Sequence, residues 1–345
     1  MQREGTGTGY CSAFSLQFTV MSSVSSVLCA ISLAVAPIYL VLTATALASI
    51  SLPLLRDLAS HGKTRLSTVR RRRGKSPYLE SVLRRAIQYA VEGDAVLVSK
   101  RRFVHFYLVG IVSTTALSAH CNGQRFTSLY DVVPTILLLA HLARRIYECM
   151  FIHSWGDGRM HIGGYILGVL HYTLIGFVFV ETICGDQDSC LPTDSEPPAV
   201  LGMFFGAALC LYGQVEQNFH HRILAKLRNS GSVRETSSGY RIPRGRWFEL
   251  VSCPHYFAEI LVYAAFAIML HIRGYLCRRQ WFGLDSNESY AAGIRRYQHL
   301  VLFVWVAVNL TISAHKCHQW YVEQFLRYPP HRRALIPSLR RVGAD

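Results

Sequence analysis

The chain has 345 residues, of which 51% are hydrophobic and 17% charged, and its formal net charge at pH 7 is +15. This balance is too apolar for an ordinary soluble domain and too charged for a bundle that lies wholly in lipid. The lysines and arginines lie in the connections between apolar stretches, which argues against nucleic-acid binding and is typical of the charges that orient membrane helices. We therefore expect an all-α, polytopic membrane protein with about seven transmembrane helices.

The N-terminal region predicts a first membrane span. No charged residue occurs from Gly5 to Leu55, and the apolar part from about Val24 to Leu52 exceeds the roughly 20 residues that cross a bilayer. It is also longer than the apolar region of a signal peptide, so we expect it to be retained. The basic run from Arg70 to Arg73 resembles a nuclear signal, but in so apolar a chain it is better interpreted as cytosolic charge that also contacts anionic lipid.

Further apolar stretches predict six more spans, at about 103–121, 129–152, 161–184, 199–216, 254–276 and 297–314. With the N-terminus in the lumen, 29 of the 36 lysines and arginines fall in the predicted cytosolic segments 56–102, 144–159, 217–253 and 316–345. The positive-inside rule supports this orientation, which places the C-terminus in the cytosol. The acidic connection between Cys184 and Cys190 and the sequon at Asn287 agree with a lumenal side.

Metal and Rossmann sites are not indicated. The chain has 15 histidines, including His220, His221 and the pair His315 and His318, but their spacing does not complete the histidine boxes of a membrane di-iron site. No two cysteines are spaced as CxxC, so structural zinc is not expected either, and we predict no metal. The GTGTG run at 5–9 precedes no predicted strand, so a dinucleotide would not bind through a Rossmann fold.

The 254–276 stretch carries His255, Glu259 and Tyr263 at intervals of four residues, which places them on one face of a helix. Hydrocarbon cannot solvate an ionisable side chain, so a carboxyl group at membrane depth normally faces protein or water and takes part in function. Several arginines that could bind phosphate through bidentate hydrogen bonds precede this helix; they are Arg222, Arg228, Arg241, Arg244 and Arg246. By spacing alone, they would serve equally well as orienting charges.

A second polar stripe, at Asn309, Ser313, Cys317 and Tyr321, runs along the last predicted span and its exit. Small polar residues on a membrane helix often form hydrogen bonds between helices. By its spacing, this stripe is as consistent with packing as with function.

Six segments of the chain resemble the steroid 5α-reductase family, and within it the polyprenol reductase branch. They are SKRRFVHFYLVG (99–110), ARRIYECMFIHSW (143–155), MHIGGYILGVLHY (160–172), QNFHHRILAKLR (217–228), YRIPRGRWFELVSCPHYFAEILVY (240–263) and NLTISAHKCHQWYVEQFLRYPPHRRALIP (309–337). The resemblance divides the chain into a catalytic membrane domain at 99–345 and a poorly matched part at 1–98, which contains the first span and a basic loop.

The resemblance implies an endoplasmic-reticulum enzyme that binds NADPH from the cytosolic side and reduces a carbon-carbon double bond of a long-chain polyprenoid. Such an enzyme supplies dolichol for protein N-glycosylation and has no obligate protein partner. In the family pattern, arginines hold the phosphates, and Glu259 and Tyr321 lie near the nicotinamide. The positions that fall where the family contacts NADPH are Gln217, His221, Arg228, Tyr240, His255, Glu259, Tyr321 and Arg332.

The chain departs from the family at the proton donor. Steroid-reducing members use a Glu and a Tyr in their N-terminal half, but here Leu142 stands at the Tyr position and the Glu region reads His105-Phe106-Tyr107. A neutral phenol or imidazole can donate a hydrogen bond to an oxygen that gains charge, so Tyr107 or His105 is our candidate donor. We count Glu259 as the third candidate catalytic residue.

The substrate follows from the chemistry of hydride. Hydride adds readily to an alkene conjugated with a carbonyl and very poorly to an allylic alcohol, while the protein supplies orientation and electrostatics. We therefore expect the unsaturated aldehyde, rather than the free alcohol, to be reduced. Two alternatives are a membrane methyltransferase that uses S-adenosylmethionine on prenylated cysteine and a lipid-binding protein without activity.

Overall fold

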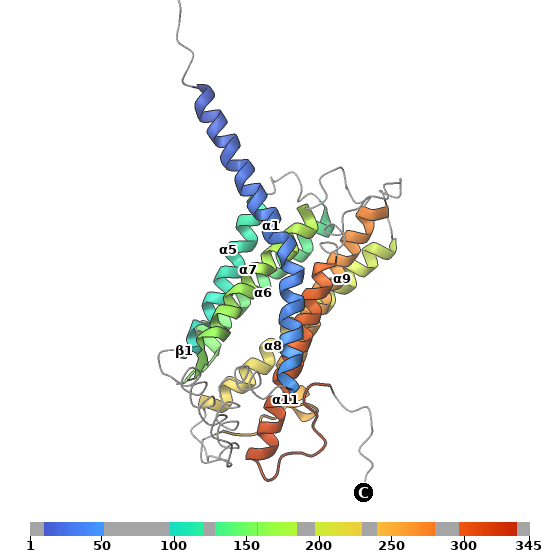
Figure 1. Ribbon diagram of the computed structural model, residues 1–345. Coiled ribbons are helices and arrows are strands. Elements are labelled where there is room, and N and C mark those ends of the chain that lie inside the picture. The colour runs from blue at the N-terminus through green and yellow to red at the C-terminus, as the bar shows by residue number, and fades with distance from the viewer. Residues whose placement is uncertain are drawn as a thin grey trace, which may run out of the picture.

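The computed structural model describes residues 10–51, 97–120, 128–156, 158–184, 197–229, 240–279 and 297–336. These residues form a long helical bundle (Figure 1). Its seven α-helices are α1 (Tyr10–Ser51), α5 (Phe103–His120), α6 (Leu129–Tyr147), α7 (Ile162–Cys184), α8 (Pro197–Asn229), α9 (Pro254–Arg279) and α11 (Gln298–Gln324). The predicted all-α fold with about seven transmembrane helices is confirmed.

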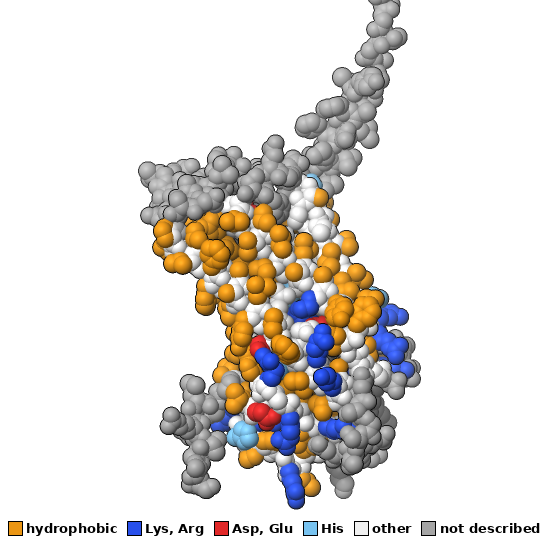
Figure 2. Space-filling view, turned by 180° about the vertical axis from the view of Figure 1, so that it is seen from behind, with side chains coloured by type: hydrophobic (Ala, Val, Ile, Leu, Met, Phe, Trp, Pro, Cys, Tyr) orange, Lys and Arg blue, Asp and Glu red, His pale blue; other side chains and the backbone are white. Residues whose placement is uncertain are grey.

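Six of these helices contain a stretch that is long and apolar enough to cross a membrane; α6 is the exception among the described helices. Asp131, Arg144 and Arg145 lower its hydropathy, and their side chains face protein partners rather than lipid. The outward faces of other helices carry exposed apolar side chains such as Val112 and Phe204. Figure 2 shows this apolar surface on the upper part of the molecule and basic side chains gathered below it. The chain is a multi-span membrane protein.

Several features predicted from the sequence lie outside the described residues. These are the GTGTG run, the basic run 70–73, Cys190 and the Asn287 sequon. The orientation of the termini, the cysteine pairing and the boundary between residues 98 and 99 therefore stay predictions.

Helices α8 and α9 pack closely because glycines of α8 face α9. A Cβ on Gly206 would lie 2.5 Å from Cγ of Met269, and a Cβ on Gly213 would lie 3.0 Å from the backbone oxygen of Ala258. Small residues let the backbones of membrane helices approach each other in this way. Gln217 is one helical turn after Gly213 on the same face of α8, so the close contact brings Gln217 against α9.

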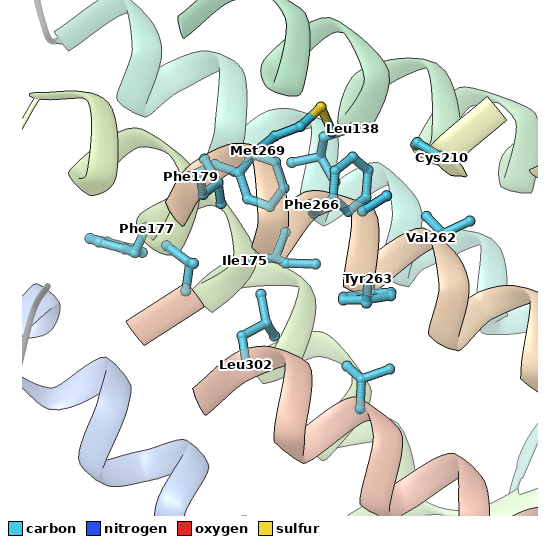
Figure 3. Packing of buried hydrophobic residues seen from close by; sticks show 14 of the residues in the cluster. Leu138, Ile175, Phe177, Phe179, Cys210, Val262, Tyr263, Phe266, Met269 and Leu302 are labelled. Atoms are coloured by element: carbon cyan, nitrogen blue, oxygen red, sulfur yellow. The ribbon is translucent and has the colours of Figure 1, made fainter. Parts of the chain in front are cut away.

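Apolar side chains fill the centre of the bundle. Leu138, Ile175, Phe266 and Met269 come from three helices and are almost fully buried, and Figure 3 shows them packed together. Phe266 contacts Phe179 edge to face, with ring centroids 5.0 Å apart. This packing holds α6, α7 and α9 together beside the polar side chains described below.

Short elements close the end of the bundle that carries most of the basic residues. Strand β1 (Leu97–Ser99) pairs antiparallel with β2 (Arg159–His161), and the short helices are η2 (Lys100–Arg102), η3 (Glu148–Ile152) and η4 (Arg246–Glu249). After α11 the chain returns to the start of α9, where the N–H of Ser252 donates to the carbonyl of Arg333 at 2.8 Å. This contact fixes the neighbouring Arg332 against the loop that precedes α9.

We predict that Gly213→Ala destabilises the protein, because the added methyl group meets the backbone oxygen of Ala258 and forces α8 away from α9. Overpacking of this kind costs about 1–3 kcal/mol. The measurement is the thermal unfolding of purified protein in detergent. Gly274→Ala on α9 is the matched control, since a Cβ there has no neighbour within 4 Å. Equal melting temperatures of the two variants would contradict this account of the contact.

Candidate active site

Glu259 points from α9 into the bundle, not toward lipid. Its side chain is 13% exposed, and its Oε1 lies 3.5 Å from Nε2 of His141 on α6. Its Oε2 accepts a hydrogen bond from the amide of Gln217 on α8. Three helices therefore meet at this carboxylate, as expected for an ionisable group at membrane depth that takes part in function.

Glu148 is a second buried carboxylate, and it lies at the centre of the polar network. Arg144 and Arg145 both form ion pairs with it. Its Oε2 is 2.8 Å from Nδ1 of His221, and its Oε1 accepts from Nδ2 of Asn218 at 2.7 Å. Removing charges from water is costly unless each is paired and hydrogen-bonded, and Glu148 meets both conditions.

Arg144 joins the two carboxylates. It pairs with Glu148, and its Nη2 also donates to the Oε1 of Gln217, whose amide nitrogen donates to Glu259. Its Nη2 lies 3.3 Å from Nδ1 of His141 as well. Positive and negative groups therefore alternate across α6, α8 and α9, which offsets the cost of burying each charge.

A widened helical turn follows α6 at Glu148. The segment η3 is a π-helix, in which the N–H of His153 donates to the carbonyl of Glu148 at 2.8 Å. Single π-helical turns are rare and occur frequently at functional sites. The ring of His153 lies edge to face with that of His221, with centroids 4.8 Å apart. Burial lowers the pKa of His153 to about 3, so the ring is neutral at pH 7.

Glu148, His153 and His221 could hold a metal ion by their spacing, because their donor atoms lie within 4.8 Å of one another. Their charge environment argues against it. Two arginines already neutralise Glu148, and Nη1 of Arg145 lies 2.8 Å from Nδ1 of His221. A divalent cation would face both guanidinium groups. These residues fit an ion-pair centre better than a metal site, and the absence of a metal stays a prediction.

The structure separates the two candidate proton donors. The hydroxyl oxygen of Tyr107 accepts hydrogen bonds from Arg145, from Nη2 at 2.8 Å and from Nε at 3.2 Å, and the side chain is buried. Its own hydroxyl proton is not used in either bond. His105 is exposed and pairs instead with the hydroxyl of Tyr165, at 2.9 Å. Only Tyr107 of the two joins the polar network.

Aromatic side chains form a second part of the site at the end of α11. The ring of Tyr321 stacks on Tyr328, with centroids 5.4 Å apart and an interplanar angle of 13°. The ring of Tyr240 lies edge to face with that of Trp320, with centroids 5.0 Å apart. These contacts bring together Tyr240 and Tyr321, two of the predicted cofactor residues, from segments that are far apart in the sequence.

Arg332 is buried beside this aromatic group. Its Nη1 donates to the carbonyl of Pro243 at 2.8 Å, and its Nη2 donates to Oε2 of Glu249 at 2.9 Å. A hydrogen bond from the N–H of Gly245 and the one from Arg332 outweigh partial burial and lower the pKa of Glu249. The backbone of Gly245 has a φ of +93°, which favours glycine. Arg332 therefore anchors the turn that precedes α9.

Two further cofactor candidates lie between the polar network and the aromatic group. The ring of His255 is 5.8 Å from that of His221, centroid to centroid, across α8 and α9. Arg228 lies exposed near the end of α8, where its Nη1 donates to the carbonyl of Ser154. The predicted phosphate ligand Arg246 forms an ion pair with Glu216, whereas Arg228 has no ion-pair partner among the described residues.

Sequence reasoning missed His141, Arg144, Arg145, Glu148 and Asn218 as site residues. We counted Arg144 and Arg145 among the orienting charges of the predicted cytosolic segment 144–159. The available signal was the spacing of Glu148, three and four residues after the arginines, which places opposite charges on one helical face.

We predict that Glu148→Ala strongly destabilises the protein, because it leaves Arg144 and Arg145 without their buried counter-charge. Breaking a buried pair in this way costs about 3–5 kcal/mol. Thermal unfolding in detergent measures the loss. Glu323→Ala, at an exposed position of α11, is the control and should have a small effect. If Glu148→Ala melts at the wild-type temperature, Glu148 does not hold the network together.

Comparison with known proteins finds a family match in the C-terminal half of the chain. Residues 169–278 and 280–339 match the family model described as 3-oxo-5-alpha-steroid 4-dehydrogenase. The polyprenal reductase of Xenopus tropicalis is 33% identical over 209 residues, which span 60% of each chain. Polyprenal reductase of Danio rerio is 27% identical over 69% of this chain and 78% of its own length. Polyprenal reductase 1 of Arabidopsis thaliana is 28% identical over 70% of this chain and 81% of its own.

The matched region contains α8, α9, α11 and the segment with Arg332, and so most of the site described above. The sequence resemblance and the family match agree. Residues 169–339 therefore form a domain that is similar to the 3-oxo-5-alpha-steroid 4-dehydrogenase family.

Proposed function

We propose that this protein is an NADPH-dependent reductase of the endoplasmic-reticulum membrane that reduces the α-isoprene double bond of polyprenal and so supplies dolichol for protein N-glycosylation. The observation that carries the proposal is the buried network from Glu259 through Gln217, Arg144 and Glu148 to Arg145 and Tyr107. It occupies a chain whose relatives are named polyprenal reductases. An oxidoreductase acting on a carbon-carbon double bond is the activity of that family.

Several residues fit NADPH. The Nε of Arg332 is buried and has no hydrogen-bond partner among the described residues, so this guanidinium keeps a donor for an anionic group. Arg228 offers an exposed cation nearby, since its charge acts on Tyr321. Arginine is well suited to phosphate because its planar fork donates two parallel hydrogen bonds.

The nicotinamide end needs polar partners inside the bundle. Glu259 and Gln217 together offer an acceptor and a donor that match a carboxamide. When bound, NADPH would supply a hydride to the β-carbon of the unsaturated aldehyde. We assign its binding to Gln217, His221, Arg228, Tyr240, His255, Glu259, Tyr321 and Arg332.

The protein must then stabilise the charge that develops on the aldehyde oxygen. Tyr107 can donate its hydroxyl proton in a hydrogen bond to this oxygen, because Arg145 occupies the acceptor side of the phenol. The positive charge of Arg145 polarises the phenol and strengthens that bond. Glu259 keeps a positioning role, since its carboxylate orients Gln217 and His141.

The membrane setting suits the substrate. A long isoprenoid tail can stay in the bilayer among the apolar outer faces of the helices, while its aldehyde reaches the polar network. With the C-terminus in the cytosol, the end with Arg228 and Arg332 faces the cytosolic NADPH pool. The comparisons give no support to a methyltransferase or to a lipid-binding protein without activity.

We predict that the purified protein with NADPH reduces polyprenal rapidly and polyprenol little, because only the aldehyde conjugates the double bond to a carbonyl. Product formation from each lipid is measured separately by chromatography. The same protein should bind NADPH and not S-adenosylmethionine in titrations. Rapid turnover of the alcohol alone would reject the aldehyde as substrate, and binding of S-adenosylmethionine alone would reject the reductase.

We predict that Tyr107→Phe lowers kcat by about 100-fold or more, the usual size for loss of a proton or oxyanion donor. NADPH affinity should stay near the wild-type value, because the phenol contacts Arg145 rather than the predicted phosphate ligands. His105→Ala should have the smaller effect, since His105 lies outside the network. Equal losses in both variants would contradict this ranking, and unchanged turnover in both would remove them from the mechanism.

A further inference from the structure

A second chain of polar side chains crosses the apolar core. The hydroxyl of Tyr39 on α1 lies 3.2 Å from Nδ1 of His171 on α7, and Nε2 of His171 lies 3.2 Å from the hydroxyl of Tyr263 on α9. Tyr39 is 0% exposed and Tyr263 is 3% exposed. Both tyrosines belong to the main cluster of buried apolar residues, and Figure 3 shows Tyr263 there. Three hydrogen-bonding groups in series are unusual in such surroundings.

This chain reaches the polar network. Tyr263 is one helical turn after Glu259 and shares its face of α9, and it hydrogen-bonds with Tyr172. The ring of Tyr172 lies edge to face with that of Tyr107, with centroids 5.0 Å apart. Tyr263 also lies within electrostatic range of both Glu259 and Tyr107. The Tyr263 hydroxyl and the Tyr107 hydroxyl therefore border the same region between α5, α7 and α9.

Reduction of an unsaturated aldehyde needs two separate groups. One donates a hydrogen bond to the oxygen, and the other gives a proton to the α-carbon. Tyr107, held by Arg145, suits the oxygen. The two buried carboxylates are poor acids, because Glu148 is paired with arginines and Glu259 faces His141 and Gln217. The second donor must come from elsewhere in the site.

We propose that Tyr263 is the acid that protonates the α-carbon, and that His171 and Tyr39 are positioning residues that keep its phenol protonated. The inference rests on the proposed polyprenal reduction. Hydride adds to the β-carbon, and the double-bond electrons move toward the oxygen to form an enolate. The enolate reforms the carbonyl as its α-carbon takes the hydroxyl proton of Tyr263.

The hydrogen bonds allow the proton to be replaced. The hydroxyl of Tyr39 lies 3.2 Å from both Nδ1 and the backbone oxygen of His171. In the tautomer in which Tyr39 donates to Nδ1, Nε2 carries the proton and donates to the oxygen of Tyr263. His171 then leaves the hydroxyl proton of Tyr263 available for transfer to substrate. After transfer, the phenolate takes the proton from Nε2 as Nδ1 takes the hydroxyl proton of Tyr39, so the imidazole stays neutral. One proton from solvent per turnover then restores the hydroxyl of Tyr39. The balance is one aldehyde, one NADPH and one proton in, and one saturated aldehyde and one NADP⁺ out.

The same chain could simply join α1, α7 and α9, since polar side chains also form hydrogen bonds between membrane helices. A packing role and an acid role differ in one measurable result. In D₂O, an acid held on one side of the substrate places deuterium on one face of the α-carbon. Packing alone does not determine that face.

The test uses the full chain in lipid nanodiscs with NADPH and polyprenal in D₂O. The product is trapped at once with borohydride, and the configuration of the α-carbon deuterium is read by NMR after derivatisation. The wild type should give one configuration. Tyr263→Phe should lower kcat by about 100-fold, leave the NADPH Kd unchanged and give both configurations, because water then delivers the deuteron. Tyr275→Phe, an exposed tyrosine on the same helix, is the matched control and should behave as wild type.

The outcomes separate the two proposals. If wild type reduces polyprenal and Tyr263→Phe keeps the wild-type kcat and a single configuration, the acid role of Tyr263 is rejected and the proposed reductase activity is retained. If wild type does not reduce polyprenal, the proposed function itself falls. Should Tyr263→Phe fail to fold by size-exclusion chromatography, Tyr39→Phe and His171→Gln carry the test. Each should lower kcat by about tenfold and mix the configurations, and a single configuration in both would overturn the proposal.

Discussion

Burying four charges among membrane helices is the constraint on which the rest of the structure depends. Arg144, Arg145, Glu148 and Glu259 come from α6, the turn after it and α9. Lipid cannot solvate them, so each must find a partner inside the protein. Gln217 and His221 of α8 complete those contacts. The network fixes the positions of three helices relative to one another as well as forming the site.

Glycines on α8 let α8 and α9 approach closely enough for this network to form. Ordinary side chains at Gly206 and Gly213 would separate α8 from α9 and withdraw Gln217 from Glu259. Phe266, two helical turns after Glu259, packs against Phe179 and holds α9 against α7. Polar pairing and apolar packing therefore act at successive turns of the same helix, and together they orient Glu259.

The sequence predicted the helices well, because long apolar stretches leave few alternatives in a membrane protein. The face of α9 with His255, Glu259 and Tyr263 was also predictable, since helical periodicity alone places these residues together.

The partners of these residues on other helices were not predictable. Hydropathy falls at the end of a span, but α8 continues as one helix to Asn229, so His221 and Arg228 lie on a helix that we predicted to be a connection. Likewise, we interpreted Arg144 and Arg145 as orienting charges, and only the structure shows that both pair with Glu148. The difference between His105 and Tyr107 follows from geometry, because residues two apart on a helix point in different directions.

The route of the chain after α11 has a consequence for how the protein matures. Arg332 follows every described membrane helix in the sequence, and it reaches its place only when residues 333 and 334 bond to the backbone at the start of α9. The helices can enter the membrane one after another during translation. The Pro243 carbonyl and Glu249 can bond to Arg332 only later, after Arg332 has been translated. A chain released early would therefore be fully inserted in the bilayer yet lack Arg332, which anchors the turn that precedes α9. Membrane insertion alone would not report a completely folded protein.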